Sequence, residues 1–202
     1  MREVKHRRIA LEDPDRIRPA ELRDLFDHWL LHSRRGRAPR RSQFDMSVLR
    51  PVMPYAALVW VAREPAEIRY RAVGDRLVEL LGEDPTGRSP EEVYHPHVAE
   101  EVIRVLTAAM RTGKPAYDLC EFSALGLTAG YRRLLLPLAH ESLDAGYVIV
   151  CAYPQRKGAR KAKDWRGILS ASPLKPDCIS DSRQIWDASM AANDPDIEIV
   201  YL

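Results

Sequence analysis

The chain has 202 residues, enough for one domain with extensions or for two small domains, and 46% of its residues are hydrophobic and 30% charged. This composition is typical of a soluble globular protein, and no apolar run approaches the ~20 residues that a bilayer-spanning helix needs. The net charge of +2 is too small to indicate a nucleic-acid partner. The first residues lack the long apolar stretch of a secretory signal, so we expect a cytoplasmic protein that does not enter the membrane.

The N-terminal part of the chain contains one clear helix. Residues 1–18 are rich in charge and show no periodicity, so we assign them to an extension. A helix is predicted over residues 19–33, because apolar side chains recur there at spacings of three and four and share one face. That face consists of Leu22, Leu25, Phe26, Trp29 and Leu30. Gly36 and Pro39 end the segment.

A hairpin is predicted next. Strands are expected at residues 58–62 and 67–73, joined by a turn around Glu64-Pro65. The stretch before them, residues 44–54, contains two prolines and is expected to be irregular or to form short helices.

Two helices of different length follow the hairpin. The first is predicted at residues 75–81 and the second at 96–112, where an apolar stripe recurs with helical spacing. That stripe consists of Val98, Val102, Val105, Leu106, Ala109 and Met110. Gly113 is the expected stop signal, with Pro115 beyond it.

Three more strands are predicted, at residues 116–123, 131–138 and 146–153. The last two are apolar on both of their alternating faces, which is typical of a sheet that is covered on both sides. The long helix 96–112 is the expected cover of one face, and the helix 19–33 is the candidate for the other.

The C-terminal residues 154–202 form a predicted charged extension. Residues 156–166 carry six cations and one acid, whereas residues 175–202 carry a net charge of −4 and end in a predicted strand, 197–202. This basic run and the arginine cluster at 34–41 have three interpretations: a solvated surface, a contact with an acidic partner or with the chain's own tail, and a nucleic-acid contact. The first is favoured, because no nucleic-acid reader motif accompanies the charge.

Few residues carry a pattern that predicts catalysis or metal binding. His95, His97, Glu100 and Glu101 are neighbours in sequence, but their spacing matches no strong metal pattern, so no metal site is predicted. No Ser-His-Asp or Cys-His set stands out, which argues against an enzyme. The loop 82–87 lacks the ending of a phosphate-binding loop. The three cysteines lack CxxC spacing and are expected to be free thiols that pack in the fold.

Several short pieces in combination resemble a PAS-domain family that is common in alphaproteobacteria. These pieces are His28-Trp29, Arg35-Gly36-Arg37, Pro39-Arg40-Arg41, Phe44-Asp45-Met46, Tyr70-Arg71-Ala72-Val73-Gly74 and Gly82-Glu83-Asp84-Pro85-Thr86-Gly87. The resemblance covers about residues 19–153. The chain departs from the family pattern at Met46, where a proline is usual, and at Pro85 within the glycine loop.

The resemblance implies an α+β fold. A five-stranded antiparallel sheet in the order 2-1-5-4-3 would carry helices on one face and the N-terminal helix on the other. The domain would span residues 19–153. Some PAS domains hold haem through a histidine near the long helix, where His97 would be the counterpart, and others hold flavin through a cysteine motif that this chain lacks. We predict no cofactor, because the family has no agreed ligand or catalytic residue.

The resemblance also implies a function. We expect a non-enzymatic sensor or regulator that acts through protein–protein interaction, which a small ligand can modulate. The alternative is a dedicated small-metabolite-binding module. A protein partner and a homodimer are expected, with no nucleic-acid partner. The expected interface is the helix face formed by Leu22, Leu25, Phe26 and Trp29.

A ligand pocket is expected between the sheet and the long helix. Its candidate lining is Trp60, Tyr70, Val102, Leu106, Leu134, Leu136 and Val148. Arg71 and Arg133 could anchor a ligand carboxylate if they faced this pocket, but the favoured interpretation places them on the opposite face, paired with acidic residues. Gly74 and Gly87 are expected to adopt backbone conformations that other residues avoid.

Overall fold

The computed structural model describes residues 17–33, 38–62, 67–94, 96–124, 127–140, 145–154 and 183–184. The basic run 156–166, the predicted strand 197–202 and most of the arginine cluster lie outside these described residues.

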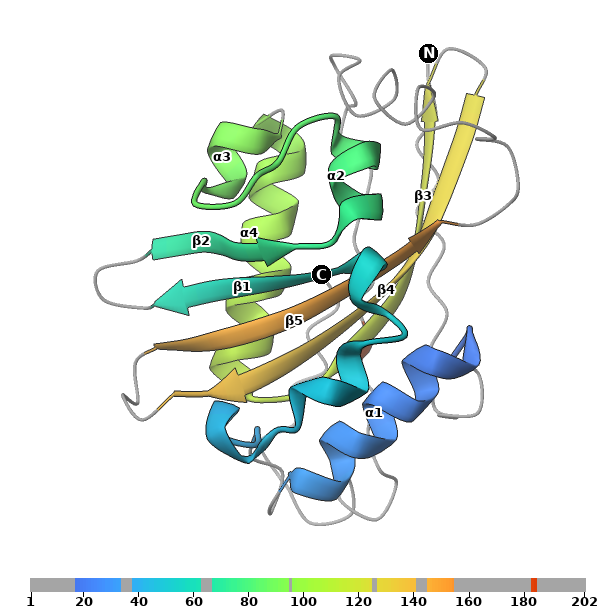
Figure 1. Cartoon of the computed structure of the whole chain (residues 1–202). Helices are drawn as coiled ribbons and strands as arrows, with labels where there is room; N and C mark the ends of the chain where they lie inside the picture. The colour runs from blue at the N-terminus through green and yellow to red at the C-terminus, as the bar shows by residue number, and fades with distance from the viewer. Residues whose placement is uncertain are drawn as a thin grey trace.

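The centre of the fold is an antiparallel sheet (Figure 1). Its strand order is β2-β1-β5-β4-β3, which is the predicted order, and a two-residue strand, β6, pairs with β3. The strands are β1 (Ala56–Ala62), β2 (Glu67–Val73), β3 (Ala116–Ala124), β4 (Leu127–Ala139), β5 (Ala145–Pro154) and β6 (Arg183–Gln184). Only β4 departs much from its predicted bounds: it begins at Leu127, four residues before the expected start at Tyr131, and pairs with β3 as far as its first residue.

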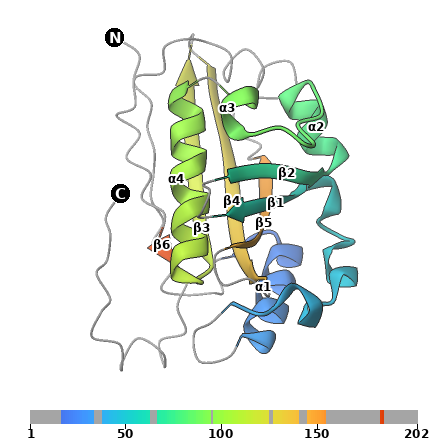
Figure 2. The same cartoon turned by 90° about the vertical axis from the view of Figure 1, so that its left-hand side faces the viewer.

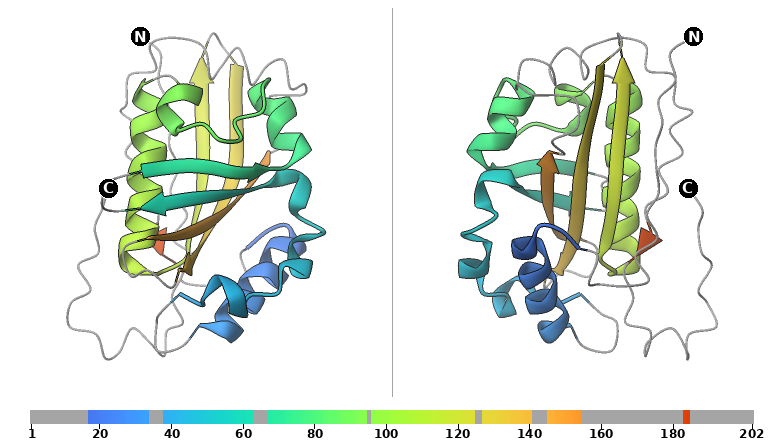
Figure 3. Two further views of the ribbon diagram at one scale, coloured as in Figure 1. Left: turned by 60° about the vertical axis from the view of Figure 1, so that its left-hand side comes forward. Right: turned by 90° about the vertical axis from the view of Figure 1, so that its right-hand side faces the viewer.

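Helices cover both faces of this sheet. The helices are α1 (Ala20–His32), α2 (Asp75–Leu81), α3 (Pro90–Val93) and α4 (Pro96–Thr112), and short 3-10 helices η2 (Arg41–Gln43), η3 (Met46–Leu49) and η4 (Met53–Tyr55) lead into β1. Figure 2 shows α4 lying along one side of the sheet and α1 on the other. Helices α2 and α3 lie on the same side as α4 (Figure 3). The predicted division of the helices between the two faces is confirmed.

The alternation of side chains along each strand produces two separate hydrophobic cores. On β1, Val59 and Val61 belong to the core beneath α4, whereas Ala56 belongs to the core beneath α1. On β4, Leu135 packs toward α4, and its two neighbours Leu134 and Leu136 pack toward α1. Because successive side chains of a strand point to opposite faces, one strand supplies both cores.

Helix α1 buries its apolar stripe against the sheet of the same chain. Leu22, Leu25, Phe26 and Trp29 are at most 3% exposed. The indole nitrogen of Trp29 donates a hydrogen bond of 2.7 Å to the carbonyl of Pro137 on β4. The pairing of β4 with β3 ends at Leu135, before this residue. The assignment of these four side chains to a dimer interface is therefore wrong for this structure, because they are core residues of the protomer.

The two glycines singled out from the sequence have different structural roles. Gly87 has a φ of +84°, in the left-handed region that favours glycine, as expected. Gly74 has an ordinary φ of −73°, so the expectation fails there. A Cβ at Gly74 would lie 1.9 Å from the carbonyl oxygen of Met53, which shows that close packing of two backbone segments requires this glycine.

Ile17, which the sequence places in the N-terminal extension, is fully buried in the core beneath α1. The packed domain therefore begins earlier than the predicted residue 19. Within the described part of the chain, none of the helices combines the length and the apolar character that crossing a bilayer would require.

Candidate ligand cavity

A cavity of about 110 Å³ lies between the sheet and the helices α2 and α4. Leucines of α2, valines of α4 and small residues of the strands give it a largely apolar wall. Its apolar lining is Ala57, Val73, Leu77, Leu80, Leu81, Val98, Val102, Val105, Leu106, Leu135, Val150 and Ala152. Its polar lining is Tyr70, Tyr94, Tyr131 and Arg133.

Three of the seven predicted pocket residues line this cavity: Tyr70, Val102 and Leu106. The other four do not, and their assignment is corrected. Leu134 and Leu136 lie in the core beneath α1, on the opposite face of the sheet. Trp60 packs edge-on against Tyr147, which contacts that same opposite core. Val148 does face α4, but it is fully buried in the packed core and does not reach the cavity.

The error has a simple physical origin. Strand β4 is apolar at successive positions, so its sequence does not show which set of alternating side chains faces α4. The pairing of β4 with β5 places Leu135 opposite Val150 and Arg133 opposite Ala152. These four residues therefore share the α4 face, and the intervening leucines belong to the other face.

Arg133 is the polar centre of the cavity wall. It is 4% exposed and faces the cavity, whereas the sequence interpretation placed it on the opposite face. Its partner is Asp118, 2% exposed, which lies directly opposite on β3. The Nε of Arg133 donates to the two carboxylate oxygens at 3.0 and 3.2 Å, and Nη2 makes a further bond to Oδ2. The expected acidic partner is thus present, on the face that was not favoured.

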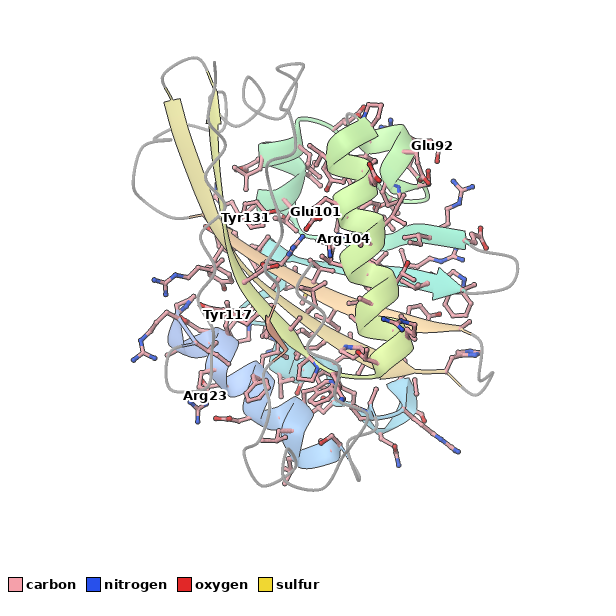
Figure 4. The ribbon with its side chains drawn as sticks, turned by 180° about the vertical axis from the view of Figure 1, so that it is seen from behind. Arg23, Glu92, Glu101, Arg104, Tyr117 and Tyr131 are labelled. Carbon is pink, nitrogen blue, oxygen red and sulfur yellow. The ribbon has the colours of Figure 1, made fainter. Side chains whose placement is uncertain are left out.

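Helix α4 contributes a second ion pair beside the first. Glu101 and Arg104 are linked at 2.9 Å between the Arg104 Nε and Glu101 Oε2, and Figure 4 shows both side chains extending from α4 toward β3 and β4. The other oxygen, Oε1, lies 3.9 Å from Nη2 of Arg133, is buried and accepts no hydrogen bond. Arg133 therefore has two carboxylates within 4 Å, one from β3 and one from α4.

Three tyrosines complete the polar part of the lining. The hydroxyls of Tyr70, on β2, and Tyr94, which follows α3, are hydrogen-bonded at 3.1 Å. Burial, together with the neighbouring Tyr94, raises the pKa of Tyr70 well above its ordinary value, and burial also raises the pKa of Tyr94. Both groups are therefore neutral donors near pH 7. The ring of Tyr131 lies 6.0 Å from the guanidinium carbon of Arg133.

The remaining sequence candidates do not converge on a site. Arg71 is exposed, and so is Glu100 at the start of α4. His95 and the side chain of His97 lie outside the described residues. Among the side chains that the structure describes, no group of three or more His, Cys, Asp or Glu residues could hold a metal ion.

Cys151 fits the expectation of a packing cysteine. It is a free thiol, fully buried in the core beneath α1, and this burial raises its pKa to about 12. The thiol is therefore protonated at neutral pH and unsuited to nucleophilic chemistry. The side chains of Cys120 and Cys178 lie outside the described part of the chain.

Comparison with known proteins identifies the family. The model of the PAS domain family matches residues 17–150, about two thirds of the chain. The chain belongs to the PAS domain family. PAS domains are typically sensory, non-catalytic modules, and they commonly mediate protein interactions. None of the curated proteins matches the chain.

Two solved structures are similar to this chain. One is the PAS domain of BvgS from Bordetella pertussis, with 15% identity, a TM-score of 0.42, and coverage of 55% of this chain and 87% of that one. The other is a domain of an HTR-like protein from Haloarcula marismortui, with 15% identity, a TM-score of 0.36, and coverage of 49% and 96%.

Proposed function

We propose that this PAS domain is a non-enzymatic sensor that binds a small ligand in the cavity beneath α4 and passes the bound state on through protein–protein contact. The observation that carries the proposal is the cavity itself. It is a partly open hollow beside an otherwise packed core, with half-buried leucines of α2 and valines of α4 in its wall, and such apolar space is unfavourable unless something fills it or function requires it.

The size of the cavity limits the ligand. Its volume of about 110 Å³ is somewhat smaller than the engineered protein cavity of roughly 150 Å³ that binds benzene. Pockets for drug-sized ligands have volumes of about 300–1,000 Å³. The cavity therefore suits a ligand of about one ring at most, and a larger one requires α2 or α4 to move.

The helices that line the cavity provide a route for the signal. Leu77, Leu80 and Leu81 of α2 and the valines of α4 contact the space directly. A ligand that fits better beneath one arrangement of these helices than another shifts the population toward that arrangement. A partner that binds the outer surface of α2 or α4 would then bind with altered affinity.

Homodimer formation and a cytoplasmic location stay predictions. A dimer cannot use the apolar stripe of α1, because that stripe is buried within the protomer. It would need another surface. The outer side of α1 is one option, since it carries Leu31 with 78% of its surface exposed.

A dedicated small-metabolite-binding module is the second candidate. The cavity favours it equally, because ligand binding is common to both proposals. The two differ in whether occupancy changes the affinity for a partner protein, so a pull-down with and without ligand separates them. An affinity that does not change on ligand addition favours the binding module.

Native mass spectrometry of the freshly purified full chain tests ligand binding. We expect a non-covalent adduct, or uptake of an added one-ring compound such as benzyl alcohol. The variant Ala57→Leu places a larger side chain in the cavity and should abolish the adduct. Ala72→Leu, at an exposed position of β2, adds the same side chain elsewhere and should retain it. A wild-type chain that carries no adduct and takes up no added compound contradicts the proposal.

A further inference from the structure

The polar wall of the cavity determines which charge a ligand can carry. Two cations, Arg133 and Arg104, and two anions, Asp118 and Glu101, form one continuous group, in which Arg133 lines the cavity and the other three lie behind it. Their formal charges sum to zero. Arg133, the member that lines the cavity, already has a carboxylate on each of two sides.

An anionic ligand would meet an unfavourable environment here. Its carboxylate would lie beside Asp118 and Glu101, two acidic groups that already flank Arg133. The surrounding wall is apolar, and an ion that moves from water into such a wall loses hydration that only a free counter-charge can replace. A cationic ligand would lie against Arg133 and meet like-charge repulsion.

The tyrosine pair offers what a neutral ligand needs. Two hydroxyls carry two protons, and the hydrogen bond between Tyr70 and Tyr94 uses one of them. Among the contacts of the described residues, the second proton has no acceptor. Both side chains line the cavity. The pair can therefore donate one hydrogen bond to an oxygen atom of a ligand.

We propose that the cavity selects an uncharged molecule of about one ring that carries a hydroxyl or carbonyl oxygen, held by the Tyr70–Tyr94 hydroxyl pair, and that it rejects a carboxylate of the same shape. This selectivity rests on the proposed function, because it presumes that the cavity binds a ligand. It specifies the class of molecule that is sensed.

Four probes of nearly equal shape test the selectivity: toluene, benzyl alcohol, benzoate and benzylammonium. The dissociation constant of each is measured by calorimetry or ligand-detected NMR with the full chain at pH 7, where the last two are charged. We expect benzyl alcohol to bind about fivefold more tightly than toluene, the gain of one neutral hydrogen bond. We expect benzoate and benzylammonium to bind at least about tenfold more weakly than benzyl alcohol.

A double variant locates the effect. Tyr70→Phe/Tyr94→Phe removes both hydroxyls and keeps both rings, so the ratio of the toluene and benzyl alcohol dissociation constants should fall toward one while toluene binding is retained. Either single variant leaves one hydroxyl with a proton to donate and should keep part of the preference. Retained toluene binding also shows that the variant is folded around its cavity. Tyr55→Phe is the matched control, since Tyr55 stacks on Tyr153 at 4.4 Å on the other side of the sheet and should leave the ratio unchanged.

The outcomes distinguish this inference from the proposed function. Benzoate or benzylammonium binding as tightly as benzyl alcohol overturns the selectivity and leaves ligand binding intact. A ratio that the double variant Tyr70→Phe/Tyr94→Phe preserves overturns the role of the hydroxyl pair. Failure of all four probes to bind the wild-type chain overturns the inference and the proposed function together.

Discussion

At the scale of single residues, Arg133 and Asp118 are the two buried charged side chains of the described part of the chain. Each satisfies the other across β3 and β4, and the loss of one leaves the other buried without this partner. Such a pair adds little net stability, but it cannot be broken cheaply. It also favours the observed register of the two strands, because the charges lie directly opposite each other.

Replacing one member of this pair should destabilise the fold more than replacing both members. Arg133→Leu leaves Asp118 buried without the guanidinium that it binds and should lower the free energy of unfolding by roughly 3 kcal/mol. The double variant Arg133→Leu/Asp118→Leu should recover most of that loss. Urea unfolding of both variants measures the difference. A double variant that is less stable than the single one would show that the ion pair itself is strongly stabilising.

His28 should make stability depend on pH. Its Nε2 is buried without a hydrogen bond among the described residues. Burial is the largest cause that lowers the pKa of His28 below 6.5, and the neighbouring His32 lowers it further, whereas Asp45 raises it. The unfolded chain therefore binds this proton more readily than the folded one. The contribution of neutral His28 to the free energy of unfolding is complete above the pKa that this residue has in the unfolded chain. It is lost as the pH falls toward the lower pKa of the folded chain.

We expect the urea midpoint of the wild-type chain to decrease as the pH is lowered from about 7.5 to about 5.5. The midpoint of the His28→Phe variant should decrease less. Phenylalanine suits the site, because the His28 ring already packs edge-on against Phe44, with the ring centres 4.8 Å apart. An equal fall in the variant and the wild type would assign the pH dependence to other groups.

The glycines give a contrast between two kinds of strain. Gly74→Ala should be the more destabilising change, because its Cβ would lie 1.9 Å from a backbone oxygen that cannot move alone. Gly87→Ala should cost about 1 kcal/mol, since its Cβ meets open space and only the positive φ is unfavourable. Thermal unfolding of the two variants ranks them. A larger loss for Gly87→Ala would contradict the close approach at Gly74.

At the scale of elements, helix α1 belongs to the core of the protomer. Leu25 is fully buried beneath it and Leu31 is 78% exposed, so the two leucines form a matched pair on one helix. Leu25→Ala should lower the free energy of unfolding by about 3 kcal/mol, and Leu31→Ala by less than about 0.5 kcal/mol. Similar small losses in both would show that α1 is not packed on the sheet.

The elements themselves were largely predictable from the sequence. The bounds of β2, α2 and α4 agree with the predicted ranges, because each has a clear period and a clear end signal. Helix α1 was predicted within one residue at each end. Its role was not, since an apolar stripe has the same pattern whether it packs on its own sheet or on a partner.

The candidate site was only partly predictable. The layer that holds it, between the sheet and α4, followed from the family resemblance. Its lining did not, because polar and apolar residues do not alternate along β4. The adjacent arginines Arg132 and Arg133 are followed by a run of leucines, so the sequence does not show which of these side chains face α4. The register with β3, which places Asp118 opposite Arg133, is a long-range property that local patterns do not contain. Tyr94 was missed because it lies in a short connection without periodicity.

At the scale of the whole molecule, one sheet separates two hydrophobic cores that are packed differently. The core beneath α1 contains Ile17, Phe26 and Trp29 and has the largest buried side chains. The core beneath α4 contains the cavity. The proposed ligand would therefore alter the packing of α2 and α4, while the core on the other face would keep the sheet in place.

Methyl NMR of the full chain titrated with benzyl alcohol tests this account most directly, because β4 carries reporters of both interiors. The methyl signals of Leu135 in the cavity wall, and of Leu77 and Val102 on the helices, should shift as benzyl alcohol is added and reach a plateau at high concentration. Those of Leu134 and Leu136, in the opposite core, should change far less. Shifts concentrated at Leu134 and Leu136, or no saturable shift at the cavity leucines and valines, would contradict the assignment of the cavity as the sensing site.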